Sequence, residues 1–291
     1  MTHAAALVAL HAAVALFGFA GLFGKWLALS PVAIVLGRTA IAAVALGILR
    51  LRARRHAAFD VRLIGNGVVL ALHWLSFFEA IQVSTVAVGL LGYASFPLFT
   101  LVAERIFFAR RFRRREGVTA LLVTAGLVLL VPELSLANPV VQGLAWGIVS
   151  GFTFALLVVM NRRWTGTRTA TDIAFWQNGL AALALLPFAL AAPWDIGTVG
   201  AREIMLLIVL GLCCTALAHT LFIGALAVVT AHTASVIAAL EPVYGIVLAV
   251  AFLGEVPGVR TIAGGALIVA AAVIATRRSH LGTVPSRSPI G

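Results

Sequence analysis

Long apolar runs recur along nearly the whole chain, and they limit what it can fold into. We count ten of them, at residues 4–24, 31–49, 62–82, 84–108, 116–131, 140–160, 170–192, 203–225, 230–252 and 259–276. About 20 helical residues, rising 1.5 Å each, cross roughly 30 Å of hydrocarbon. The chain is 62% hydrophobic and only 11% charged, unlike a soluble domain. The sequence therefore predicts an all-α integral membrane protein with ten transmembrane helices.

The basic residues are gathered in a few connections between these runs. Of the 21 Lys and Arg residues, 16 fall within 50–62, 110–115, 162–168 and 277–291. With a cytoplasmic N-terminus and ten crossings, all four clusters lie inside, and only Lys25, Arg202 and Arg260 lie outside. This asymmetry follows the positive-inside rule. It predicts a multi-pass protein of the bacterial inner membrane with both termini cytoplasmic. It also accounts for the net charge of +11 without nucleic acid as a partner.

The two parts of the chain resemble each other. HWLSFFEAIQVSTVAVGLLGYASFP matches AHTLFIGALAVVTAHTASVIAALEP without a gap, at the offset of 145 that separates Pro97 from Pro242. A second match, at an offset of 139, places Arg38 opposite Gln177. We therefore predict two five-helix repeats with a linker between them and a tail after them. The predicted segments are repeat 1–131, external linker 132–139, repeat 140–276 and cytoplasmic tail 277–291.

The odd number of helices in each repeat has a consequence for topology. The second repeat enters the membrane from the opposite side, so the two repeats are inverted. Inverted repeats are a common plan of secondary transporters, in which the substrate binds between the repeats near the midplane. A duplicated packing scaffold is the alternative. The sequence favours a transporter that works by alternating access and functions as a monomer.

Counting 1.5 Å per residue from the helix ends places several polar and aromatic residues near the midplane. The candidate substrate-binding residues are Phe17, His73, Trp74, Tyr93, Phe154, Trp176, Gln177, Glu241 and Tyr244. Aromatic walls with a few polar groups suit a small, partly apolar ligand. Three alternatives stay open. His73 and Ser76 form a hydrogen-bonded pair that joins two helices, Trp74 faces lipid, and the phenylalanines only pack between helices.

Glu241 and the prolines are the most unusual residues of the apolar runs. A carboxylate at the bilayer centre costs about 2.5–3.5 kcal/mol, so Glu241 is expected to face a partner or a wet cavity, for proton coupling or as a structural acceptor. Pro97 and Pro242 lack the N–H that would bond the carbonyls of Tyr93 and Ala238. We predict kinks at both prolines, acting as hinges or serving packing alone.

Other features exclude function classes. The sequence has no HExxH or GxSxG motif and no pair of midplane aspartates, so we expect no enzyme and no metal site. Arg38 is the only deep cation, which disfavours phosphorylated substrates, and it is expected to pair with Glu79 near the outer face. The partners expected are a small molecule and the lipid bilayer. An organic cation or another small metabolite remains an alternative substrate.

The end of the second repeat carries a recognisable pattern. LEPVYGIVLAVAFLGE, followed by GVRTIAGGALIVAAAVIA, resembles the signature that closes each repeat of the EamA family in the drug/metabolite transporter superfamily. The first repeat has a degraded copy in which Phe96 replaces the glutamate. The chain is most similar to YddG-type exporters. This resemblance implies metabolite export without a soluble cofactor, with neutral amino acids, aromatic ones included, passing between the repeats.

Overall fold

The protein is helical along the chain. The computed structural model describes residues 1–52, 58–108, 114–131, 135–191, 199–238 and 240–276, and within these ranges every regular element is a helix. Six helices are long and apolar enough to cross a membrane: His3–Trp26, Pro31–Arg52, Arg62–Val83, Pro139–Trp164, Ala170–Ala191 and Ala201–Leu226. Four shorter ones are also apolar: Val86–Thr100, Gly117–Leu130, Glu241–Leu253 and Val259–Ala271. The chain is a multi-pass membrane protein.

Each apolar run of the sequence is occupied by helix. The elements up to residue 131 are α1 (His3–Trp26), α2 (Pro31–Arg52), α3 (Arg62–Val83), α4 (Val86–Tyr93), α5 (Phe96–Phe108) and α6 (Arg114–Leu130). The later elements are α7 (Pro139–Trp164), α8 (Ala170–Ala191), α9 (Ala201–Gly211), the π-helical turn η2 (Leu212–Leu217), α10 (Ala218–Leu226), α11 (Ala231–Ala238), α12 (Glu241–Leu253) and α13 (Val259–Thr276). The predicted tail 277–291 and part of the predicted linker, 132–134, lie outside the described residues.

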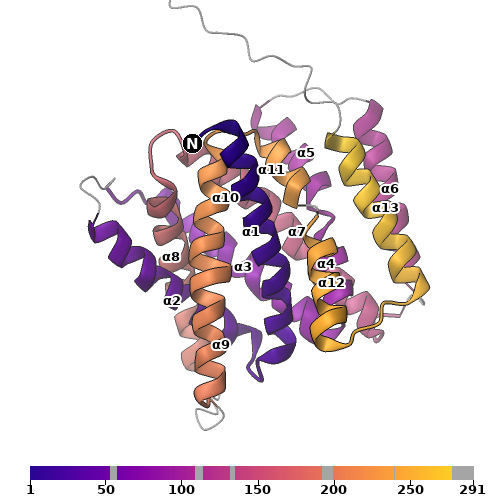
Figure 1. Ribbon diagram of the computed structural model, residues 1–291, viewed down its shortest axis with the longest axis horizontal. Helices are drawn as coiled ribbons and strands as arrows, with labels where there is room; N and C mark the ends of the chain where they lie inside the picture. The colour runs from indigo at the N-terminus through magenta and orange to yellow at the C-terminus, as the bar shows by residue number, and fades with distance from the viewer. Residues whose placement is uncertain (53–57, 109–113, 132–134, 192–198, 239, 277–291) are drawn as a thin grey trace, which may run out of the picture.

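The helices form one bundle. The start of α1 and the end of α13 lie at the same end of it, which we call the N-terminal end (Figure 1). Helices α6 and α13 pack against each other at one edge of the bundle, beside α12 and α4 (Figure 1). A core of large apolar side chains fills the space where α1, α3, α4, α7 and α10 meet.

Two of the predicted transmembrane helices are each divided into two helices at matching points. Helix α4 ends at Tyr93, before α5, and α11 ends at Ala238, before α12. Pro97 and Pro242 are the second residues of α5 and α12. Proline suits the first turn of a helix because its missing N–H would have no acceptor there. We expected a kink in a continuous helix at each proline. The structure instead has one helix end before each proline and a new helix begin there.

Glycines hold the divided helices close to their neighbours. A Cβ atom at Gly18 of α1 would lie 2.8 Å from the backbone nitrogen of Gly245 in α12. A Cβ atom at Gly147 of α7 would likewise lie 2.8 Å from the carbonyl oxygen of Gly89 in α4. Small residues permit such close approach of transmembrane backbones. The break points of both divided helices thus lie against a tightly packed partner helix.

Candidate substrate-binding site

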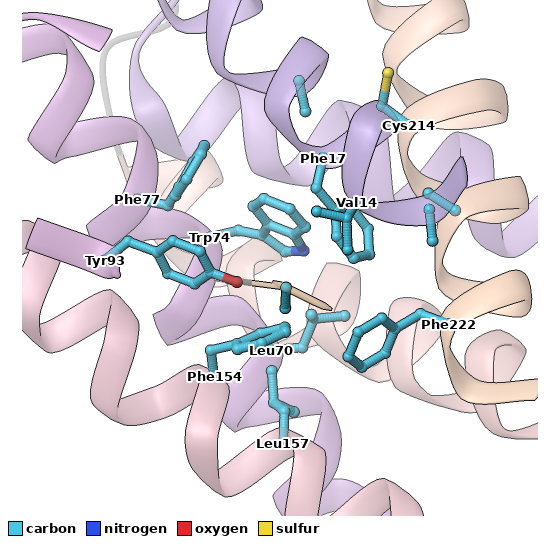
Figure 2. Close-up of a cluster of buried hydrophobic side chains, with 14 of the residues drawn as sticks. Val14, Phe17, Leu70, Trp74, Phe77, Tyr93, Phe154, Leu157, Cys214 and Phe222 are labelled. Atoms are coloured by element: carbon cyan, nitrogen blue, oxygen red, sulfur yellow. The ribbon is translucent and has the colours of Figure 1, made fainter. Parts of the chain in front are cut away.

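A small cavity of about 20 Å³ lies near the middle of the bundle. It is lined by Phe17, Leu70, His73, Trp74, Tyr93, Phe154, Leu157, Val158, Asn161, Gln177, His219, Phe222, Ile223 and Glu241. In Figure 2 the rings of Phe17, Trp74, Tyr93, Phe154 and Phe222 converge from different helices, and the Tyr93 hydroxyl points into the space between them. This volume holds about one water molecule, so the side chains around it are packed closely in this form of the protein.

Seven of the nine predicted binding residues line this cavity, and two do not. Trp176 and Tyr244 are not among the lining residues. Trp176 directly precedes Gln177 on α8, so the two side chains point about 100° apart, and its ring packs 5.1 Å from that of Phe175. Tyr244 follows Glu241 by three residues and lies against Gly18 of α1. Trp74 is only 3% exposed, so it does not face lipid.

His73 links α3 to α7. Its Nδ1 atom lies 3.0 Å from both the carbonyl oxygen and the hydroxyl of Ser150. Ser76 does not take part, because its hydroxyl donates to the backbone carbonyls of Leu72 and His73 in its own helix. The His73 ring also lies 5.3 Å from that of Phe154. These contacts fix the imidazole as part of the cavity wall.

Glu241 is the first residue of α12 and is 2% exposed. The N-terminus of a helix carries partial positive charge, which stabilises a carboxylate there. The Tyr93 hydroxyl, at the end of α4, hydrogen-bonds to this carboxylate. Among the described residues the ion pairs are Arg50–Asp172, Arg168–Asp172 and Arg202–Glu203, so Glu241 is in none of them. The two break points thus meet through one hydrogen bond beside the cavity.

Amide side chains close the cavity toward the N-terminal end of the bundle. The Asn66 and Gln177 amides, on α3 and α8, both donate to Oδ1 of Asn161 on α7, at 3.0 and 3.1 Å. Next to them Asn178 lies 3.4 Å from Nδ1 of His219 on α10. The network joins helices from both parts of the chain at one level of the bundle.

Arg38 lies on the other side of the cavity, behind Trp74. Its guanidinium carbon is 3.5 Å from the centroid of the Trp74 ring. Its Nε and Nη2 atoms donate to the hydroxyl of Thr215 and the carbonyl of Cys214, at 2.9 and 3.1 Å. The predicted pair with Glu79 is therefore wrong. The π-turn is the reason, since its wider hydrogen-bonding pattern presents these acceptors to α2.

Sequence reasoning missed three polar or aromatic lining residues. Phe222 carried a signal, because the internal match places it opposite Phe77. Asn161 is next to the basic pair Arg162 and Arg163, which directs attention to charge alone. His219 comes only after the π-turn, which changes the direction of every following side chain. It stacks on Trp74 with ring centroids 5.8 Å apart.

Six apolar helices of membrane-spanning length, with two divided helices beside a central aromatic cavity, are the arrangement expected of a membrane transporter. The chain belongs to the EamA-like transporter family, whose model matches residues 4–131 and again residues 141–277. The prediction of this family is confirmed. The family, in the superfamily of drug/metabolite transporters, indicates transport.

Several known proteins are similar to this chain. An uncharacterized transporter of Archaeoglobus fulgidus is 30% identical over 75% of this chain and 77% of its own length. The pseudopaline exporter CntI of Pseudomonas aeruginosa is 28% identical over 74% of each chain. Protein RarD of Salmonella typhi is 26% identical over 66% of this chain and 64% of its own. One crystal structure, 21% identical, superposes with a TM-score of 0.72 over 95% of this chain and all of its own, which shows a shared fold.

Proposed function

We propose that the protein is a secondary transporter of the bacterial inner membrane that exports neutral amino acids, including aromatic ones. The observation that carries the proposal is the aromatic cavity beside the hydrogen bond that joins the two break points. Ten transmembrane helices in two inverted repeats, 1–131 and 140–276, move against each other and expose this cavity to one side at a time. The substrate is a small molecule, and the protein acts as a monomer in the bilayer.

The packing of the helices supports inverted repeats. Helix α1 packs on α10 and α12, and its counterpart α7 packs on α3 and α5, which correspond to α10 and α12 at the offset of 145. The ends of α1 and α7 also make equivalent contacts. Lys25 donates to the Ser84 carbonyl at 2.6 Å, while Arg162 donates to the carbonyl of Val229, which matches Ser84 at the offset of 145. These two contacts lie at opposite ends of the bundle, as inverted repeats require. The double match of the family model agrees with this.

The lining of the cavity supports an amino acid as the substrate. Rings from α1, α3, α4, α7 and α10 stabilise an apolar or aromatic side chain by burial and ring contacts. Glu241 is available to the substrate ammonium, because it has no ion-pair partner among the described residues. Export as the direction of transport draws support from the relative that is named a pseudopaline exporter.

An organic cation is the second candidate. A single carboxylate among aromatic faces is also the environment that attracts quaternary ammonium groups. The two substrate classes differ in one group. An amino acid has a carboxylate, which the protein must bind, and a quaternary ammonium ion has none. Uptake of radiolabelled tetraethylammonium by proteoliposomes, without inhibition by neutral amino acids, would favour the cation.

The experiment that tests the proposal compares two phenylalanines of α7. Phe154 lines the cavity and is 7% exposed, whereas Phe152 is 46% exposed on the outside of the bundle. We expect Phe154→Ala to lower tryptophan transport by about tenfold and alanine transport by less than about threefold, because the larger substrate loses more contact area. Phe152→Ala is the matched control and leaves both rates near wild type. Transport is measured by counterflow in proteoliposomes with protein of unchanged size-exclusion profile.

Two results would contradict the proposal. If the wild-type protein transports no neutral amino acid, the substrate class is wrong. If Phe154→Ala slows tryptophan and alanine equally, the ring is not part of the binding site.

A further inference from the structure

Arg38 is fully buried, yet it has an unused hydrogen-bond donor. Its relative exposure is 0%, and its Nη1 group has no hydrogen-bond partner. Thr215 and Cys214 satisfy only the Nε and Nη2 side of the guanidinium. A buried donor without an acceptor is costly, and more so when it is charged. A structural role for Arg38 in holding the π-turn explains two of its contacts and leaves this group unexplained.

The ring of Trp74 separates Arg38 from the cavity. Arg38 stacks on this ring, and Trp74 in turn lines the cavity together with His219, whose ring is nearly parallel to it at 15°. The Trp74 indole Nε1 is also buried without a partner, so no hydrogen bond holds the ring in place. Figure 2 shows Trp74 in the middle of the converging rings. Trp74 is thus the side chain that contacts both Arg38 and the cavity.

The two charges beside the cavity have opposite signs. The electrostatic effect of Arg38 extends to Glu241, although the two side chains form no ion pair. An α-amino acid carries an ammonium and a carboxylate on adjacent carbons. A guanidinium binds a carboxylate with two parallel hydrogen bonds, which gives both strength and orientation.

We propose that Arg38 binds the carboxylate of the substrate and that Trp74 covers this group when no substrate is bound. The inference rests on the proposed function, because it assigns one group of an amino acid substrate. Binding of the carboxylate by Arg38 makes the transporter select amino acids over amines that have the same side chain and no carboxylate.

The test uses two compounds that differ only in the carboxylate, L-phenylalanine and phenethylamine. Each competes with counterflow of radiolabelled leucine in proteoliposomes that contain the full chain. For the wild type we expect phenylalanine to compete at a concentration about tenfold to a hundredfold lower than phenethylamine. In Arg38→Gln this ratio falls to less than about threefold, chiefly because phenylalanine competes less well. Arg38→Lys gives an intermediate ratio, since lysine keeps the charge and loses the fork.

Two further variants separate carboxylate binding from a structural role. Thr215→Val removes an acceptor of Arg38 in the π-turn and keeps the guanidinium, so we expect the wild-type ratio. Arg260→Gln removes an exposed arginine and is the control for loss of a positive charge.

The inference is overturned if the wild type does not distinguish the two compounds, if Arg38→Gln keeps the wild-type ratio, or if Thr215→Val loses as much as Arg38→Gln. If Arg38→Gln does not fold, the test rests on the ratio of competing concentrations in the wild type and in Arg38→Lys. Failure of the proposed function is a different result, in which the wild-type protein moves no leucine. If leucine is transported and Arg38→Gln leaves the ratio unchanged, only the role of Arg38 is contradicted and the proposed function stands.

Discussion

At the scale of single residues, Glu241 is held by weak and separate interactions. The carboxylate lies in the first turn of α12 and next to the Tyr93 hydroxyl, and no described cation forms an ion pair with it. An intramembrane carboxylate without a fixed counterion is able to exchange a proton or to bind a cationic group. Both possibilities agree with its place in the cavity wall.

We therefore expect Glu241→Gln to uncouple transport from the proton gradient. Accumulation driven by a pH gradient falls to equal concentrations on both sides, because the amide does not take up or release a proton at these pH values. Counterflow, which needs no gradient, decreases less. Both are measured in the same proteoliposomes, with Glu79→Gln as the control because Glu79 is a carboxylate of α3 outside the cavity. Accumulation at the wild-type rate in Glu241→Gln would assign the carboxylate a structural role.

The sequence predicts depth better than it predicts direction. The rise of the helix places His73, Tyr93 and Glu241 near one level before any contact is known. Which way a side chain points depends on the neighbouring helices, so Gln177 enters the cavity and Trp176 does not. The contact of Arg38 with Trp74 was not predictable for the same reason. It needs the π-turn, and no periodicity of the sequence indicates one.

At the scale of elements, the divided helices are the feature that the internal match anticipates best. Both breaks occur at prolines that correspond in the two repeats, and both lie next to a glycine contact. The form of the break was not predictable, because a proline within an apolar run is compatible with a kink or with a new helix. Two short helices that meet end to end change their mutual angle more easily than a continuous helix does.

We expect Pro97→Ala and Pro242→Ala to slow counterflow severalfold without unfolding the protein. Alanine permits a continuous helix, and its effect on the free energy of unfolding is about 1 kcal/mol or less at such positions. Transport rates and thermal unfolding in detergent are compared for each variant. Pro187→Ala is the matched control, since Pro187 lies inside α8, which is not divided. Wild-type rates in both hinge variants would mean that the breaks serve packing alone.

At the scale of the whole molecule, the distribution of basic residues determines how the bundle lies in the membrane. At the N-terminal end of the bundle, the last turn of α7 carries Arg162 and Arg163, and the connection to α8 carries Arg168. The connection between α12 and α13, at the opposite end, carries Glu255 and precedes a single arginine, Arg260. This bias favours a cytoplasmic N-terminal end.

The orientation is testable with two cysteines in a background in which Cys213 and Cys214 are replaced by alanine. Gly166 and Gly258 are exposed, and no atom lies within 4 Å of a Cβ added at either, so cysteine fits at both. We expect an impermeant maleimide to label Gly258→Cys in spheroplasts with an intact inner membrane. It labels Gly166→Cys only after the membrane is opened. The reverse labelling pattern would show that the N-terminal end of the bundle faces the outside.

The buried arginine has a consequence for the balance between the two faces. Arg38 contacts the π-turn, whereas its counterpart Gln177 bonds to Asn161 and is uncharged. If the two repeats were identical, the inward-facing and outward-facing forms would be related by a two-fold rotation and would have equal free energy. A cation on only one side of the cavity removes this degeneracy, so the empty carrier is expected to rest in one form more often than in the other. The more populated form determines on which side of the membrane the empty binding site is open, independently of any gradient.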